Sequence, residues 1–169
     1  MNRIDQTFAR LKSEGKKAFM PFVTACDPNA RTSVKIVRAL EDAGADIVEL
    51  GFPYSDPLAD GPTIQDSYAR VLGNGCSVRD AIGVVASVRK HSMMPIAAMV
   101  SYSIVWRVGV EAFAGAISRA GADALIVPDL PPEEAQALDA ACRANSIGLV
   151  FLVTPMTPPE RTKRIVQAS

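Results

Sequence analysis

The chain has 169 residues, 49% of them apolar, with 18 basic and 18 acidic side chains, as expected for one globular domain with a substantial core. The balanced charge and the absence of a basic block argue against a nucleic-acid-binding protein. No apolar run reaches the roughly 18 residues that a membrane-spanning helix needs, and the amino-terminal segment is unlike a signal peptide because it contains acidic residues and no continuous apolar stretch.

Segments with helical periodicity alternate with short apolar runs along the chain. Runs of this length that are rich in β-branched residues are typical of buried parallel strands. The expected strands are 18–24, 47–50, 95–100, 124–128 and 147–153. The expected helices are 4–14, 32–43, 63–72, one that begins after Ser77, 110–120, 131–145 and one that begins after residue 157.

This alternation implies a parallel sheet with right-handed crossover connections. A strand spacing of roughly 35 residues predicts an α/β fold that corresponds to the first five strand-helix units of a (β/α)8 TIM barrel. An open doubly wound sheet is the alternative, but no GxGxxG loop follows the first strand.

Local residue types predict several helix ends. Gly44 is expected to end its helix in a left-handed conformation, and Pro62 is expected at the first position of the helix after the second strand. The segments 77–80 and 157–160 fit capping boxes, in which Ser77 and Thr157 would be the capping residues.

The tetrapeptide Ala-Gly-Ala-Asp occurs at 43–46 and again at 120–123. Each copy lies between the end of a helix and the start of a buried strand. The repeat suggests one supersecondary unit that is reused around a barrel.

The residues after the second strand form the most informative stretch, ADIVELGFPYSDPLADGPTIQ at 45–65. Glu49 interrupts an apolar strand one residue before its end, and a carboxylate there is costly unless it is neutral, paired or faces a wet cleft. Asp60 follows in the next loop. Because the carboxyl ends of the strands form the catalytic face of barrel enzymes, these two carboxylates are the candidate catalytic pair. The structural alternatives are a solvated strand end for Glu49 and a turn or cap residue for Asp60.

Cysteine and histidine give no sign of a metal site. Cys26, Cys76 and Cys142 are far apart and contain no CxxC pair, so we expect neither a disulfide framework nor zinc. Reduced thiols predict a cytoplasmic protein. The single histidine, His91, is expected at a helix C-terminus, where it would complement the helix dipole.

The segment 49–65 closely resembles the signature of the tryptophan synthase α-chain family. Further matches are 21–28 (PFVTACDP), 43–46 and 127–131 (VPDLP), which span nearly the whole chain in the family's order. The resemblance implies a (β/α)8 barrel that cleaves indole-3-glycerol phosphate to indole and glyceraldehyde 3-phosphate. It also implies a partner, the pyridoxal-phosphate-dependent β chain, in an α2β2 heterotetramer, with no metal or organic cofactor in this chain.

Three features depart from the family pattern. Cys26 stands where the family often has glycine, and Ser103 stands where it usually has asparagine. The last three strands of the family, with the loops that hold the substrate phosphate, have no counterpart, so residues 1–169 are expected to form a single, C-terminally incomplete barrel domain. A truncated, non-catalytic barrel that only binds the β chain is therefore the alternative function. Another phosphate-binding barrel of the same pathway fits less well, because no lysine occurs at the end of an expected strand.

The implied reaction is a retro-aldol cleavage, and the residues suit it. The leaving ring carbon must gain a proton and the side-chain hydroxyl must lose one, and a single carboxyl group can do both. Burial should raise the pKa of Glu49 and fit it to this task. Asp60 is expected to accept a hydrogen bond from the indole N–H and to stabilise positive charge there.

Other residues around this pair have predicted roles of lower specificity. Phe22, Thr24 and Tyr102 are predicted to bind substrate. The predicted partner-contact loop consists of Pro53, Tyr54, Ser55, Asp56 and Pro57. Segment 54–60 is expected to be mobile in the free chain and to become ordered with substrate and partner. Asp129 is expected to cap the following helix or to contact the partner, and Met99 and Trp106 are assigned to packing.

Overall fold

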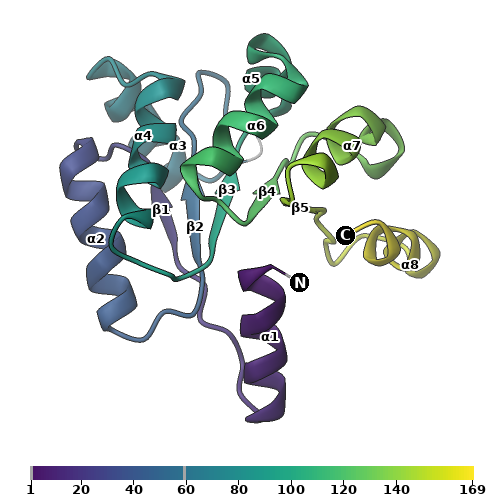
Figure 1. The fold of residues 1–169 in the computed structure, drawn as a ribbon. Coiled ribbons are helices and arrows are strands. Elements are labelled where there is room, and N and C mark those ends of the chain that lie inside the picture. Colours follow the sequence, from purple (N-terminus) through teal and green to yellow (C-terminus); the bar gives the residue numbers. More distant parts are fainter. Residues whose placement is uncertain (1, 59) are drawn as a thin grey trace.

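The computed structural model describes residues 2–58 and 60–169 (Figure 1). Met1 and Ala59, the latter part of the predicted mobile segment, lie outside the described residues. The strands are β1 (Phe22–Thr24), β2 (Val48–Gly51), β3 (Ile96–Met99), β4 (Ala124–Ile126) and β5 (Gly148–Val150). The helices are α1 (Arg3–Ser13), α2 (Ala30–Asp42), α3 (Pro62–Gly73), α4 (Val78–Arg89), α5 (Tyr102–Val108), α6 (Val110–Ala120), the 3-10 turn η1 (Pro132–Glu134), α7 (Gln136–Ala144) and α8 (Pro159–Ala168).

The five strands form one sheet in the order β1-β2-β3-β4-β5, and every neighbouring pair is parallel. The predicted α/β alternation is therefore confirmed. Four strands, β1, β3, β4 and β5, are shorter than expected. Before β1, the carbonyls of Phe19 and Pro21 still accept hydrogen bonds from Asp46 and Glu49, but Pro21 has no N–H to donate.

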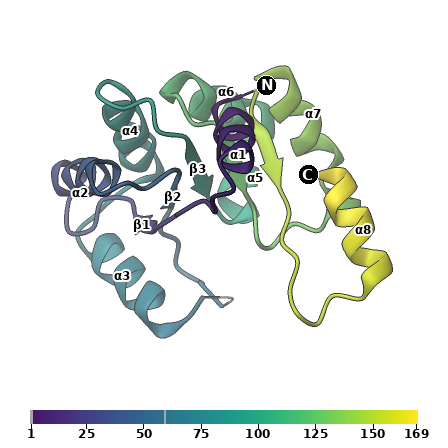
Figure 2. The same ribbon diagram turned by 90° about the horizontal axis from the view of Figure 1, so that it is seen from below.

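The sheet has an outer face covered by helices and an inner, concave face. Helices α2, α4, α6 and α7 pack side by side along the outer face (Figure 2). Because successive side chains of a strand point to opposite faces, Val48 and Leu50 enter the core under these helices, and Glu49 and Gly51 lie on the inner face. This alternation places the candidate catalytic carboxylate inside the curve of the sheet.

Helix α1 lies below the strands, at the end opposite their carboxyl termini (Figure 1). Its Ile4 packs against a small apolar cluster on the inner face, formed by Ala97, Ala124 and Ile126. The helix begins with a capping box between Asn2 and Asp5, which satisfies two otherwise unpaired N–H groups. It therefore closes the lower end of the inner face.

The two Ala-Gly-Ala-Asp copies have the same structural role. Asp46 Oδ2 accepts the N–H of Phe19 at 3.0 Å, and Asp123 Oδ2 accepts the N–H of Ile96 at 2.9 Å, so each carboxylate satisfies the backbone where the preceding strand begins. Each also pairs with an arginine of α1, since Arg10 is 3.0 Å from Asp46 and Arg3 is 2.9 Å from Asp123. The repeat therefore anchors one helix at two points.

The glycines of the two copies share a backbone conformation and differ in their surroundings. Gly44 has φ +97° and Gly121 has φ +98°, so the predicted left-handed helix end at Gly44 is confirmed. A Cβ at Gly44 would meet nothing within 4 Å, whereas one at Gly121 would lie 2.6 Å from Cγ of Arg89. Arg89 is held there by its bond to the Gly121 carbonyl, at 2.9 Å.

We predict that Gly44→Ala lowers the free energy of unfolding by about 1–2 kcal/mol, the cost of a left-handed non-glycine residue. Gly121→Ala should cost at least about 1 kcal/mol more, because Arg89 must move and lose hydrogen bonds. Urea titration of both variants measures the difference. Equal losses of the free energy of unfolding would show that Arg89 can move away from a Cβ at position 121 without destabilising the fold.

Several predicted local features are confirmed. Ser77 and Asp80 form the capping box of α4, and Pro62 occupies the first turn of α3. The inner-face cluster includes Met99, as its assignment to packing predicts. The three cysteines are free thiols.

Other local predictions are wrong. Thr157 does not cap α8, because Pro158 is the N-cap residue and makes no side-chain capping bond, while Thr157 Oγ1 accepts the N–H of Thr154 at 3.0 Å. The helix expected at 131–145 is divided into η1 and α7. The sequence interpretation missed α5, and Trp106 on that helix is 69% exposed and not part of the packing.

Within residues 2–58 and 60–169, no helix combines the length and the apolarity needed to cross a membrane. The same residues contain no cluster of three or more histidine, cysteine, aspartate or glutamate side chains that could hold a metal ion.

Candidate active site

Glu49 belongs to a row of inner-face residues that crosses the sheet. The strand register aligns it with Phe22 of β1 on one side and with Ala97 of β3 on the other. Its neighbours in this row are thus an aromatic ring and a methyl group. Burial raises the pKa of Glu49 above its usual value, because the charged form loses hydration.

The next row towards the carboxyl ends contains Thr24 and Gly51. A Cβ at Gly51 would lie 2.3 Å from the Phe22 ring and 2.9 Å from the Tyr68 hydroxyl. Because this close approach leaves room for no side chain, the position requires glycine. Sequence reasoning missed this role of Gly51 and Tyr68, although a glycine within a strand often marks such an approach.

Asp60 lies above the strands in the loop between β2 and α3. Its backbone N–H donates to the Pro57 carbonyl at 3.1 Å, and its carbonyl accepts Nε2 of Gln65 at 2.7 Å. These bonds fix the backbone at the start of α3. Burial raises the pKa of Asp60.

A small cavity of about 30 Å³ lies beside Asp60. Its remaining walls come from the loops after β2, β3 and β4 and from α3. They are Phe52, Tyr54, Tyr68, Met99, Val100, Ser101, Pro128 and Asp129. The rings of Tyr54 and Tyr68 are 5.9 Å apart. Among the described residues, Glu49 does not line this cavity, so the structure does not bring the two candidate carboxylates into one pocket.

The predicted substrate residues are distributed over this region. Phe22 and Thr24 share the inner face with Glu49. Tyr102 is the first residue of α5, and its ring is 6.3 Å from that of Trp106. It is half-buried and does not line the small cavity, whereas its neighbour Ser101 does.

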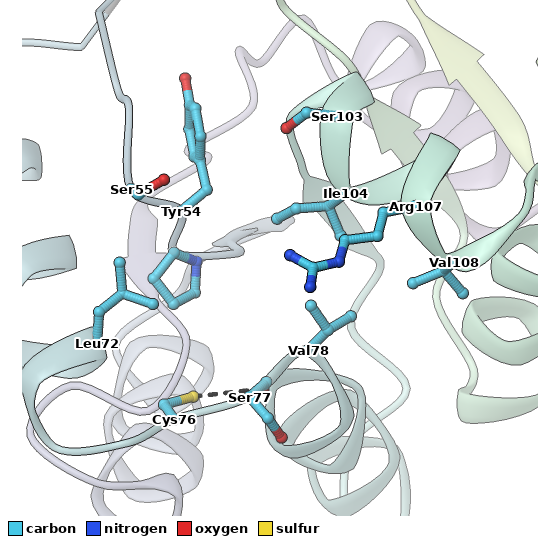
Figure 3. Close-up of a pocket in the computed structure, with 11 residues that line it drawn as sticks. Tyr54, Ser55, Leu72, Cys76, Ser77, Val78, Ser103, Ile104, Arg107 and Val108 are labelled. Atoms are coloured by element: carbon cyan, nitrogen blue, oxygen red, sulfur yellow. Dashed lines mark hydrogen bonds between the residues drawn. The ribbon is translucent and has the colours of Figure 1, made fainter.

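The predicted partner-contact loop borders a larger, open pocket of about 570 Å³. Figure 3 shows Tyr54 and Ser55 on one side of it, and Ile104 and Arg107 of α5 on the other. Leu58, which directly follows this loop, is 92% exposed. The loop therefore presents apolar surface next to a hollow between α3, α4 and α5. Asp56 and Pro57 do not line this pocket within the described residues.

The loop after β1 is tied to α3 by Asp27. Its Oδ2 accepts the hydroxyl of Ser67 at 2.6 Å and a guanidinium N–H of Arg70 at 2.8 Å. These bonds hold α3, which begins next to Asp60. Sequence reasoning missed this role of Asp27, because its partners lie 40 and 43 residues away along the chain.

The two departures from the family pattern have local structural consequences. Cys26 has φ +68°, a left-handed conformation that favours glycine, which explains why glycine suits this position. Burial raises the pKa of its thiol to about 12, so the thiolate needed for reactivity is scarce. Ser103 Oγ lies 2.7 Å from Ser101 Oγ at the start of α5, where it takes part in the capping of that helix.

The sequence model of the tryptophan synthase alpha chain family matches residues 8–169. The tryptophan synthase alpha chain of Caldanaerobacter subterraneus subsp. tengcongensis is 49% identical over 167 residues, which are 99% of this chain and 63% of that protein. The alpha chain of Arabidopsis thaliana is 45% identical over 98% of this chain and 60% of its own length. The chain thus spans about 63% of the length of the first of these curated relatives.

Solved structures give the same result. The tryptophan synthase alpha subunit from Legionella pneumophila has a TM-score of 0.95 and 36% identity, over 100% of this chain and 65% of that one. A chain from the tryptophan synthase α2β2 complex of Pyrococcus furiosus has a TM-score of 0.87 and 39% identity, over 90% of this chain and 64% of that one. The five-stranded sheet is therefore the corresponding part of a TIM barrel. The fold and the match of the family model over residues 8–169 together show that this chain belongs to the tryptophan synthase alpha chain family.

Proposed function

We propose that the protein is a lyase of tryptophan biosynthesis that cleaves indole-3-glycerol phosphate to indole and glyceraldehyde 3-phosphate. The observation that carries the proposal is the position of Glu49, which is half-buried on the inner face next to Phe22 and has a raised pKa. A carboxyl group with a raised pKa can both give and take a proton near neutral pH. Retro-aldol cleavage needs both transfers.

The proposed roles follow the bonds that change. Glu49 gives a proton to the indole ring carbon that carries the side chain and receives the proton of the side-chain hydroxyl. The bond between the ring and the side chain then breaks, and its electron pair returns to the indole ring as the aldehyde forms. Asp60 accepts a hydrogen bond from the indole N–H and stabilises the positive charge that protonation places on the ring. Phe22, Thr24 and Tyr102 are proposed to bind the substrate.

These steps need neither a metal nor an organic cofactor in this chain. Pyridoxal phosphate is proposed for the partner β chain, which would receive the indole in an α2β2 complex. The loop 53–57 is the proposed contact, because its Pro53, Tyr54 and Ser55 border the pocket next to α5. The relatives that form α2β2 complexes support this proposal. A cytoplasmic location is proposed from the three free thiols.

The second candidate is a non-catalytic barrel that only binds the β chain. It is favoured by one observation, the separation of Glu49 from the cavity of Asp60. An assay of indole release from indole-3-glycerol phosphate, with and without a β chain, distinguishes the two. Release in either condition supports the lyase, and β-chain binding without release supports the second candidate.

We predict that Asp60→Asn lowers the rate of indole release by about 10²–10³-fold, the typical effect of removing one group that stabilises developing charge. The loss should be smaller than that of Glu49→Gln, because Asp60 does not supply the carbon-bound proton. The rate is measured at saturating substrate. Asp66→Asn, an exposed aspartate of α3, is the matched control and should keep the rate. Normal turnover of Asp60→Asn would make Asp60 a turn residue only.

A further inference from the structure

Asp129 follows β4 in a tight turn, in which the Leu130 N–H donates to the Val127 carbonyl at 3.2 Å. Its carboxylate binds the start of α5, which follows the neighbouring strand β3. Oδ2 accepts the Ser101 hydroxyl at 2.8 Å. The backbone N–H of Tyr102 lies 2.9 Å from Oδ1 and 3.1 Å from Oδ2. The predicted cap of the following helix is therefore wrong, since Asp129 binds the start of α5 and neither η1 nor α7 has a side-chain cap.

Ser101 extends this network. It is only 4% exposed and is the N-cap residue of α5, where its Oγ accepts the N–H of Ser103 at 3.2 Å. A serine hydroxyl has one proton. Because Ser101 gives that proton to Asp129, the 2.7 Å contact between the two serine hydroxyls requires Ser103 to donate. The donors are thus ordered from Ser103 through Ser101 to Asp129.

Asp129 also lines the small cavity beside Asp60. Ser101, Pro128, Tyr54 and Asp60 are among the other residues that line it. Burial is the main cause that raises the pKa of Tyr54, and the charges of Asp60 and Asp129 add to it. The charge of Asp129 therefore acts on Tyr54, another residue that lines the cavity.

We propose that Asp129 is a positioning residue for the indole portion of the substrate, an inference that rests on the proposed lyase function. By binding Ser101 and the Tyr102 N–H, it fixes the turn between β3 and α5. That turn sets the shape of the cavity that Ser101 and Asp129 share with Asp60, and the direction in which α5 presents Tyr102. We assign no reacting proton to Asp129, because both of its oxygens already accept protein hydrogen bonds from Ser101 and from the backbone N–H of Tyr102.

The test compares variants of the protein in steady-state cleavage of indole-3-glycerol phosphate and in binding of indole, measured by titration calorimetry. Asp129→Ala removes every acceptor. Asp129→Asn keeps one acceptor oxygen, and Ser101→Ala removes only the hydroxyl donor. Asp139→Ala is the matched control, since Asp139 pairs with Arg143 on the surface of α7.

Asp129→Ala should raise KM and weaken indole binding by about tenfold or more, with kcat reduced by less than about threefold. Asp129→Asn should restore part of the affinity, Ser101→Ala should show an intermediate loss, and Asp139→Ala should match the wild type. The pH profile of kcat should be unchanged in all four, which a proton-carrying role would alter.

Two results would overturn the inference. A lower melting temperature of Asp129→Ala with wild-type KM and indole affinity would make the role structural only. A loss of kcat as large as that of Glu49→Gln, with unchanged indole affinity, would make Asp129 a reacting group. If the wild type binds indole but releases none from the substrate, the proposed function fails, and the indole affinities of the variants alone decide the inference.

Discussion

Glu49→Gln should lower the rate of indole formation by about 10³–10⁴-fold, in the upper part of the range for general acid-base catalysis. The effect is large because one carboxyl group is proposed to carry both proton transfers. Glutamine has a similar size and keeps hydrogen bonding, so substrate binding should change little. Single-turnover measurements of indole release, with substrate affinity determined separately, test the assignment. A rate within tenfold of the wild type would remove Glu49 from the mechanism.

The same substitution should make the fold more stable than that of the wild type, by an amount that grows as the pH rises. Burial raises the pKa of Glu49 in the folded protein. The contribution of such a group to stability is fully present below its unfolded-state pKa and is lost as the pH rises through the folded-state pKa. Glutamine does not titrate. Glu49→Gln should therefore unfold at a higher temperature than the wild type at neutral and alkaline pH, with the difference vanishing below the unfolded-state pKa of glutamate.

Glu14 provides a control of opposite sign. The charge and hydrogen bond of Lys16 are the main cause that lowers the pKa of this exposed carboxyl group. Its contribution to stability is present above the unfolded-state pKa and is lost as the pH falls through the folded-state pKa. Glu14→Gln should thus be no more stable than the wild type at neutral pH. Melting temperatures of both variants from pH 4 to 8 test the pair, and parallel curves would contradict it.

Asp123→Ala should be the most destabilising of the substitutions considered, by about 3–5 kcal/mol, the usual cost of breaking a buried ion pair. Asp123 is 3% exposed. It binds Arg89 and Arg3, each at 2.9 Å, and accepts the N–H of Ile96. Its loss leaves the guanidinium of Arg89, whose side chain is 13% exposed, without its carboxylate. Urea titration measures the free energy of unfolding.

Asp46→Ala is the matched control for this prediction, because Asp46 occupies the same place in the first copy of the repeat. It accepts the N–H of Phe19 and pairs with Arg10, whose side chain is 53% exposed. Solvent screens that pair, so the loss should be about 1 kcal/mol. If the two variants lose the same free energy of unfolding, burial of the ion pairs of Asp123 does not explain their contribution to stability.

The sequence predicted the features of the fold that depend on neighbouring residues. The strands follow from apolar runs such as 47–50, and the inner-face position of Glu49 follows from the alternation of side chains along that run. The α4 capping box follows from Ser77 and Asp80, which are three residues apart. The family resemblance added the activity, the site pair and the partner, which remain proposals.

The missed features depend on contacts between distant segments. Helix α5 has seven residues, and it is capped by Asp129 from another loop, so its own sequence carries little signal. Tyr68 approaches Gly51 because Asp27 holds α3 over β1, a contact across 40 residues. Thr157 failed as a cap because the prolines after it moved the start of α8 by one residue. The first two cases depend on such long-range contacts, whereas the third is a local effect of the prolines.

The anchoring of α1 by two arginines has a consequence for the order of events during synthesis on the ribosome. Arg10 meets Asp46 across 36 residues, and Arg3 meets Asp123 across 120. At about 5–20 residues per second, translation delivers the first partner about 2–7 s after Arg10 and the second about 6–24 s after Arg3. A helix of this length is marginal by itself, so the nascent amino terminus stays loose until β4 has been made. The last anchoring contact of α1 therefore forms only after the chain has been synthesised as far as the start of β4.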